Sequence, residues 1–358
     1  MNRMKSFFGR ADAEPRLALE DDPTQTPRER LSRFIGGGWI LILLLALVAV
    51  FWISRPAQFG SAYNLTMLAV NAAILLVLSV GQTFVIVSAG IDLSLGAVLV
   101  FSSVVSAQAM LWITGSPAGT FGTTPGGWDV VGVGLVVALA SGAAWGAFNG
   151  LLVALARIPP LIVTLGSLGM ALGLAQILTG GVDVRAVPDL LVTQIGTGTL
   201  FGIPMLVVIA CVVAIVAAVV LHLTRFGLHA FAVGSNAEAA RRSGVRLRLR
   251  VITIYALSGM LAGLAATMSI ARFSTTTING HAMDNLSTIS AVVLGGTSLF
   301  GGIGSIIGTV IGVFIPIVLL NGFVILGIPP FWQTVAMGAV LILAVWIDQL
   351  KRRTRQGS

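Results

Sequence analysis

Leu206-Val-Val-Ile-Ala-Cys-Val-Val-Ala-Ile-Val-Ala-Ala-Val-Val220 contains no polar side chain at any position. A helix on the surface of a soluble protein would place polar residues on one face, and a strand of a membrane barrel would alternate polar and apolar residues. Together with its flanks the run covers residues 203–222, which approaches the roughly 20 apolar residues that a helix needs to cross a bilayer. The stretch therefore predicts a transmembrane helix.

Similar runs occupy most of the chain on both sides of this segment. Hydrophobic residues make up 56% of the 358 residues and charged residues only 9%, whereas soluble domains carry roughly a quarter charged residues. The pattern predicts an all-α polytopic membrane protein. Ten spans are expected, at residues 36–53, 63–88, 91–113, 128–155, 160–180, 203–222, 251–271, 285–300, 304–325 and 331–348.

Positive charge predicts how these spans are oriented. Of 21 Lys and Arg residues, seven lie in residues 1–35, six in the loop 223–250 and four in residues 351–358. Loops rich in Lys and Arg remain on the cytoplasmic side. We therefore expect a disordered cytoplasmic tail (1–35), a transmembrane domain (36–350) with a cytoplasmic loop at 223–250, and a cytoplasmic C-terminal tail (351–358). The net charge of +8 is explained by this topology, so no nucleic-acid partner is expected.

Two parts of the chain resemble each other. Asn149-Gly150 and Asn321-Gly322 are each followed by an apolar run and then by Ile-Pro-Pro, at 158–160 and 328–330. Upstream, Asp92-Leu93-Ser94 is echoed by the stretch from Asp284 to Ser287. The echoes are five spans apart, and an odd offset gives the two halves opposite orientations in the membrane. An inverted internal repeat of the kind found in transporters is therefore expected.

The sequence lacks the residues of common catalytic sites. Its two lysines, Lys5 and Lys351, do not belong to a phosphate-binding loop, and its three histidines do not have metal-binding spacing. No nucleophile motif is present, and the single cysteine, Cys211, lies in an apolar run. We therefore expect no catalytic residues, no metal and no cofactor in this chain.

Asp92 is the one acidic residue that has spans close on both sides. Its carboxylate could satisfy backbone N–H groups at the start of a helix, or it could line a solute path together with Ser94. The two interpretations are compatible. Only Asp92, Arg272 and Asp284 are candidates for ionisable groups within the membrane, which is few for an ion-coupled carrier.

Residues 236–244 predict a short helix in the longest cytoplasmic loop. Asn236 suits the N-cap, the alanine-rich middle favours helix, and Gly244 suits the C-terminal end. A short helix that projects between two spans can dock in a groove on a partner protein. A solvated positively charged loop is the alternative interpretation.

The chain resembles the permease subunits of binding-protein-dependent ABC importers for monosaccharides, the ribose/xylose/galactoside type. The resemblance covers roughly residues 60–350. It rests on the order and spacing of several segments, namely Gly81-Gln82-Thr83 with Gly90–Gly96, Asn149-Gly150 with Ile158–Pro160 and Ile162–Gly166, Thr224–Gly227 with Gly234–Arg241, and Ala291–Ser298 with Gly301–Gly308.

The resemblance implies a permease dimer in the bacterial inner membrane, with both termini cytoplasmic. Its implied partners are an ABC ATPase, which binds ATP and Mg²⁺, and a periplasmic sugar-binding protein. The family's coupling region, which engages the ATPase, corresponds to Asn236, Glu238, Ala239, Arg241 and Gly244. Asp92, Ser94, Asn149, Asn285 and Ser287 are the candidate substrate-path residues.

One departure from the family pattern concerns specificity. The family commonly has Glu-Leu-Asp where this chain has Asn285-Leu286-Ser287, although Asp284 stands just upstream. The sugar could therefore differ from ribose, and an ABC permease for a polyol, a nucleoside or a branched-chain amino acid remains an alternative. An ion-coupled carrier is a third hypothesis. The connection 114–128 should face the periplasm, where it could touch the binding protein.

Overall fold

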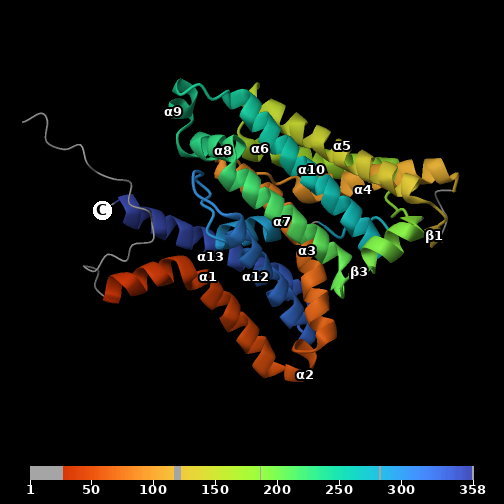
Figure 1. Ribbon diagram of the computed structural model, residues 1–358, viewed down its shortest axis with the longest axis horizontal. Coiled ribbons are helices and arrows are strands. Elements are labelled where there is room, and N and C mark those ends of the chain that lie inside the picture. Colours follow the sequence, from red (N-terminus) through yellow and green to blue (C-terminus); the bar gives the residue numbers. More distant parts are fainter. Residues whose placement is uncertain (1–26, 117–121, 186, 282–283, 357–358) are drawn as a thin grey trace, which may run out of the picture. The chain divides into compact units, whose positions relative to one another are not determined.

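The computed structural model describes residues 27–116, 122–185, 187–281 and 284–356. The chain divides into two units, Met1–Trp39 and Ile40–Ser358, and helix α1 runs across the boundary. The second unit holds the other helices and all the short strands of the described residues (Figure 1).

The helices match the expected apolar runs closely. They are α1 (Pro27–Ser54), α2 (Pro56–Phe59), α3 (Ala62–Val87), α4 (Leu95–Thr114), α5 (Trp128–Ala154), α6 (Pro160–Thr179), α7 (Met205–Leu223), α8 (Arg225–Ser235), α9 (Ala237–Arg242), α10 (Leu247–Phe273), α11 (Asp284–Leu294), α12 (Ile306–Ile325) and α13 (Pro330–Gln356). The remaining elements are β1 (Thr123–Thr124), β2 (Val187–Pro188), the π-helix Leu191–Gly196, β3 (Thr199–Leu200) and β4 (Ile203–Pro204). Strand β1 pairs in parallel with β2, and β3 pairs antiparallel with β4.

The structure confirms an all-α polytopic membrane protein but not the number of ten full spans. Among the described residues, seven helices are long and apolar enough to cross a membrane, namely α3, α4, α5, α6, α7, α10 and α12. Shorter apolar segments lie at Ile40–Ser54 and Phe331–Leu343. The expected span 285–300 is instead the 11-residue helix α11, roughly 16 Å long, which is half the thickness of the hydrocarbon core.

Two glycines explain why α11 stops early. Gly295 follows the last helical residue, and Gly296 has a φ of +88°, a conformation that glycine adopts at little cost and that ends a helix. The chain then continues through an irregular segment, 295–305, before α12 begins. The composition of this region is apolar enough for a span, but its backbone is not continuous helix.

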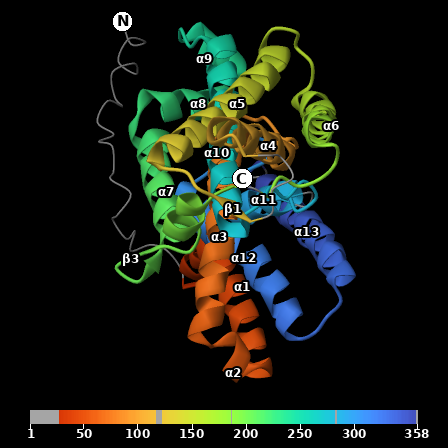
Figure 2. The same ribbon diagram turned by 90° about the vertical axis from the view of Figure 1, so that its right-hand side faces the viewer.

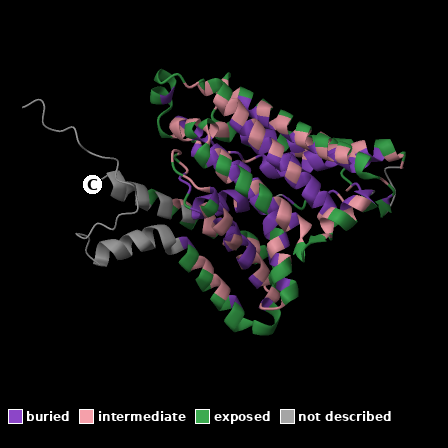
Figure 3. Ribbon diagram, viewed as in Figure 1, coloured by how far each residue is buried: buried purple, intermediate pink, exposed green. Residues whose placement is uncertain are grey.

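Helix α3 forms the centre of the bundle. In its most apolar window 94% of the residues are buried, and it packs against α7, α10, α11 and α12. In contrast, only 28% of the corresponding windows of α6 and α7 are buried. Figure 2 shows α6 on the flank of the bundle, and the colouring of Figure 3 marks exposed residues along α7. Because these exposed side chains are apolar, they suit contact with lipid.

Helices α5 and α10 approach each other most closely at glycine. A Cβ atom at Gly142 would collide with the carbonyl oxygen of Gly259, and one at Gly146 with that of Tyr255. The spacing of small residues therefore allows backbone contact, which provides packing energy where lipid offers no hydrophobic drive.

The two similar parts of the sequence adopt corresponding local structures. Helices α5 and α12 each end a few residues after their Asn-Gly pairs, and α6 and α13 each begin at the second proline of Ile-Pro-Pro. Proline is favoured at a helix start, where its missing N–H leaves no hydrogen bond unmade. The opposite membrane orientation of the two halves stays a prediction.

Two expected boundaries differ in the structure. The predicted tail 1–35 lies partly outside the described residues, but α1 begins already at Pro27, which suits a first helical position. At the other end, the helix α13 continues to Gln356, so the predicted tail from residue 351 is largely helical.

Candidate solute pathway and coupling segment

Asp92 lies in the short break between α3 and α4. Its Oδ1 atom accepts hydrogen bonds from the backbone N–H of Ser94, at 2.8 Å, and from the hydroxyl of Ser94, at 2.6 Å. The side chain is almost completely buried. Charge-assisted hydrogen bonds of this kind partly offset the cost of removing a carboxylate from water.

The Ser94 hydroxyl joins this break to helix α5. It accepts a hydrogen bond from the Asn149 side-chain amide at 2.9 Å while it donates to Asp92. Asn149 and Ser94 are both fully buried. Three of the predicted pathway residues therefore form one hydrogen-bonded chain from α5 to the start of α4.

Asn285 reaches the same helix start from α11. Its Oδ1 atom accepts the backbone N–H of Gly96 at 2.7 Å, one of the N–H groups that the first turn of α4 leaves without a partner in the helix. Gly96 has no space for a side chain, because a Cβ atom would lie 2.6 Å from the carbonyl oxygen of His281. A direct hydrogen bond thus joins α11 to the start of α4, next to the α3–α4 break.

Asp92, Ser94 and Asn149 are hydrogen-bonded to one another, and Asn285 is hydrogen-bonded to the backbone of Gly96. Such an arrangement can fix the position of two helix ends in a low-dielectric interior. It agrees with a structural role for Asp92, although the carboxylate receives the N–H of Ser94, the residue before α4, rather than that of a helical residue. Whether these residues also contact solute stays a prediction.

Ser287, in α11, is the fifth predicted pathway residue. It lines a cavity of about 290 Å³ between the end of α10, the start of α11, α3 and α12. The polar side chains around this cavity include Asn71, Arg272, Thr277, His281 and Asp284. Arg272 and Asp284 were recognisable from the sequence as charges in an apolar region, but nothing local identified Asn71, Thr277 or His281.

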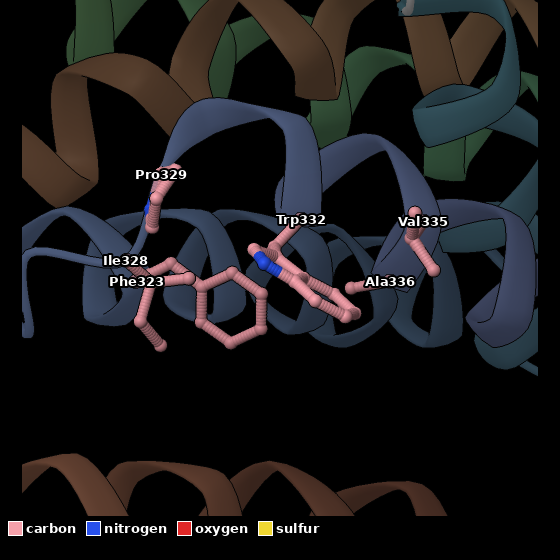
Figure 4. A pocket seen from close by; sticks show the side chains of 6 residues that line it. All are labelled: Phe323, Ile328, Pro329, Trp332, Val335 and Ala336. Atoms are coloured by element: carbon pink, nitrogen blue, oxygen red, sulfur yellow. The ribbon is translucent and has the colours of Figure 1, made fainter.

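A second cavity, of about 510 Å³, has a different character. Figure 4 shows its lining, in which the rings of Phe323 and Trp332 are accompanied by Ile328, Pro329, Val335 and Ala336. These side chains offer a polar solute almost no hydrogen-bond partners. This cavity is therefore a poor candidate for a sugar path.

The predicted short helix in the 223–250 loop is confirmed as α9. The Asn236 side chain accepts the backbone N–H of Ala239 at 3.0 Å, and Gly244, with a φ of +87°, ends the turn after the helix. Both residues therefore have the roles that their position predicts. Figure 1 shows α8 and α9 at one end of the bundle and the β3 hairpin at the other.

Glu238 holds two arginines on the exposed surface of α9. Its carboxylate accepts two hydrogen bonds from Arg241, at 2.8 and 3.0 Å, and one from Arg242 at 3.1 Å. Hydrogen bonds from Arg241 and then Arg242 hold the pKa of Glu238 below its usual range. The surface of α9 therefore combines one ionised carboxylate with two cations, a pattern suited to polar docking.

Helix α8 connects α9 to the α3–α4 break. A Cβ atom at Gly234 would collide with the carbonyl oxygen of Val87, the last residue of α3. The backbone N–H of Gly302 donates to the same carbonyl at 2.8 Å. The end of α3, helix α8 and the segment 295–305 therefore meet at Val87. Val87 lies five residues before Asp92.

The described residues contain no group of three or more His, Cys, Asp or Glu side chains placed to hold a metal ion. Nothing in their arrangement indicates a catalytic centre. Three features are candidates for a functional role. They are the polar cavity of about 290 Å³, the hydrogen-bonded break between α3 and α4, and the exposed helix α9.

Comparison with known proteins gives a consistent result. The family model described as "Branched-chain amino acid transport system / permease component" matches residues 64–345. The ribose import permease protein of Escherichia coli (strain K12) is 35% identical, over 92% of this chain and 99% of that protein. The fructose import permease protein of Rhizobium meliloti is 32% identical, over 96% of this chain and 94% of its own length.

A third relative carries a different printed substrate. The galactose/methyl galactoside import permease protein of Escherichia coli (strain K12) is 30% identical, over 89% of this chain and 95% of its own length. No solved structure is significantly similar to the chain.

Proposed function

Because this chain belongs to the family of branched-chain amino acid transport-system permease components, we propose that it forms the membrane path of an ABC importer for a monosaccharide. The observation that carries the proposal is its similarity, at 30–35% identity over nearly its whole length, to import permeases for ribose, fructose and galactosides. The polar cavity and the buried helix break are consistent with a path for a hydroxylated solute. The bacterial inner membrane is the corresponding location.

The energy for import comes from a separate ATPase in this proposal. The only lysines of the chain, Lys5 and Lys351, lie outside the apolar runs and outside any phosphate-binding loop. ATP and Mg²⁺ would therefore bind to the partner, and this chain would need no cofactor. A periplasmic sugar-binding protein would deliver the solute on the opposite side, and two copies of the permease would form the transporting unit.

Helix α9 is the proposed contact with the ATPase. Closure of the ATPase would displace α9 and α8 together, since they are joined at Asn236. Because Gly234 lies against the Val87 carbonyl, this displacement reaches the α3–α4 break, where Asp92 and Ser94 connect it to α5. The chain of contacts supports alternating access driven from the α9 end.

Purification and reconstitution test the proposal. A tagged permease solubilised from native membranes should copurify with an ATPase and with a solute-binding protein. Reconstituted in liposomes, this assembly should import at least one of D-ribose, D-fructose and D-galactose in an ATP-dependent manner. Uptake by the permease alone, driven by an ion gradient, would instead establish an autonomous carrier.

A further inference from the structure

The cavity at the end of α10 has the composition of a site for a small hydroxylated solute. Its volume of about 290 Å³ is just below the roughly 300–1,000 Å³ usual for small-molecule sites. Its wall combines aliphatic and aromatic side chains, among them Ile74, Phe273 and Ile317, with charged and amide groups. A sugar ring presents the same combination, an apolar face and polar edges.

Arg272 holds a guanidinium group in this cavity. Its Nη2 atom donates to Asn71 Oδ1 at 2.8 Å, whereas its buried Nε atom has no hydrogen-bond partner among the described residues. The Thr277 hydroxyl, also at the cavity, is buried and without a partner in the same way. Buried donors without partners are costly, so both groups favour a ligand that can accept hydrogen bonds.

Asp284 and His281 supply the opposite polarity. His281 Nδ1 donates to Asp284 Oδ2 at 2.6 Å, and His281 Nε2 lies 2.8 Å from the Ser269 hydroxyl. The imidazole thus fixes the carboxylate in place at the first turn of α11. A carboxylate and a guanidinium that line the same cavity can accept from one hydroxyl of a sugar and donate to another.

The position of the cavity agrees with import. Arg272 is 25 residues after Leu247, the first residue of α10, which places it roughly 38 Å along the helix from the α9 end. The cavity therefore lies on the side where a binding protein would deliver its solute. Two of the residues that line it, Asn71 and Gly280, are exposed.

We propose that this cavity binds the monosaccharide as it enters the permease, with Arg272 and Asn71 on one side of the ring and Asp284, held by His281, on the other. This inference rests on the proposed function. It assigns the first solute contact to Arg272 and Asp284, and it gives the buried Asp92–Ser94–Asn149 network the separate task of transmitting motion.

Uptake by the reconstituted importer, complete with ATPase and binding protein, is the first test. The variants Arg272→Gln and Asn71→Leu remove hydrogen bonds to solute, and Arg55→Gln changes an exposed arginine that lines neither described cavity. At sugar concentrations well below saturation, both cavity variants should import D-ribose, D-fructose or D-galactose about tenfold more slowly. ATP hydrolysis stimulated by the binding protein should persist, and Arg55→Gln should behave as the unaltered chain.

A second pair of measurements covers the case in which loss of Arg272 prevents folding. Leu320→Trp would fill the cavity from its apolar side and should block uptake without removing any polar group. In a Cys211→Ser background, which leaves the chain without native cysteine, Thr277→Cys should react with a thiol reagent. Saturating sugar should slow that reaction, whereas L-leucine should not.

The outcomes separate the two proposals. If the unaltered importer transports a sugar while Arg272→Gln, Asn71→Leu and Leu320→Trp all transport it normally, the cavity assignment is wrong and the proposed function stands. If the unaltered importer transports L-leucine and none of the sugars, the proposed function itself fails. Protection of Thr277→Cys by L-leucine alone would mean that Arg272 and Asp284 bind the two charges of an amino acid.

Discussion

At the scale of single residues, Ser94 is the hydrogen-bond centre of the α3–α4 break. Its hydroxyl donates to Asp92 and accepts from Asn149. A buried hydrogen bond contributes little net free energy to stability, because the same groups bond to water in the unfolded chain. A buried polar group that loses its partner destabilises the protein by its full desolvation free energy. Loss of the Ser94 hydroxyl would remove the partner of the Asn149 amide and leave Asp92 Oδ1 with only the backbone N–H of residue 94.

We predict that Ser94→Ala lowers the free energy of unfolding by about 1–3 kcal/mol, because it removes hydrogen bonds from Asp92 and Asn149 within the protein interior. Thermal unfolding of the detergent-purified permease measures this. Ser141→Ala is the matched control, since the Ser141 hydroxyl bonds only a carbonyl of its own helix. Equal melting temperatures for the two variants would show that the network contributes nothing to stability.

The predicted site residues show what a sequence can reveal at this scale. Asp92 and Ser94 are two positions apart, so their contact could be anticipated from the helix start that they occupy. Asn285 and Gly96 are 189 residues apart, and Arg272 and Asn71 are 201 residues apart. The first pair depends on how α11 packs against α4, and the second depends on how α3 packs against α10. No local sequence pattern specifies either contact.

The second prediction concerns the role of Glu238 in binding the ATPase. Reversal of its charge by Glu238→Arg should abolish copurification of the ATPase while the permease still reaches the membrane, because three arginines would then repel one another on α9. Immunoblots of the membrane fraction and of the purified assembly measure both effects. Asp129→Arg, a reversal in the first turn of α5 at the other end of the bundle, should leave the ATPase bound.

The titration of Glu238 has a defined direction. Its pKa in the folded protein is lowered by Arg241 and Arg242, so the ion pairs are present above the ordinary glutamate pKa of about 4.3 and are lost as the pH falls through the lowered value. Glu238 is therefore ionised throughout the range from about pH 6 to 8. Any pH dependence of ATPase copurification in this range should be the same in the unaltered permease and in Glu238→Gln.

At the scale of elements, the length of the apolar runs predicts the long helices well, because lipid requires each spanning segment to satisfy its own backbone. The exception is α11, where the apolar composition of 285–300 conceals a helix of half length. The Gly295-Gly296 pair is a visible signal for this, but glycine is so frequent in this chain, with 43 residues, that one pair does not stand out.

The close contact of α5 with α10 at glycine leads to a prediction about stability. Gly146→Ala should destabilise the permease by more than about 1 kcal/mol, because its Cβ would collide with the Tyr255 carbonyl and separate α5 from α10. Gly173→Ala is the matched control in α6, where a Cβ atom meets nothing within 4 Å. Thermal unfolding should show the loss at Gly146 and no loss at Gly173. The opposite ranking would contradict the packing between α5 and α10.

At the scale of the whole molecule, the half-length α11 is continued by the irregular segment 295–305. The segment after it returns to the end of α3, where Gly302 contacts both the Val87 carbonyl and Ser235 of α8. Helix α11 and the segment 295–305 together therefore cover the distance of one span. That both chain ends lie on the cytoplasmic side, as the distribution of Lys and Arg predicts, stays a prediction.

Accessibility from the two sides tests this arrangement directly. In the Cys211→Ser background, Arg242→Cys on α9 and Phe201→Cys, at an almost fully exposed position between β3 and β4, place single thiols at opposite ends of α7. An impermeant thiol reagent added to intact cells freed of their outer membrane should label only the Phe201 variant. In inverted membrane vesicles it should label only the Arg242 variant, because α9 would then face the medium. Labelling of both variants from one side would contradict the orientation, and with it the assignment of α9 to the ATPase and of the Arg272 cavity to incoming solute.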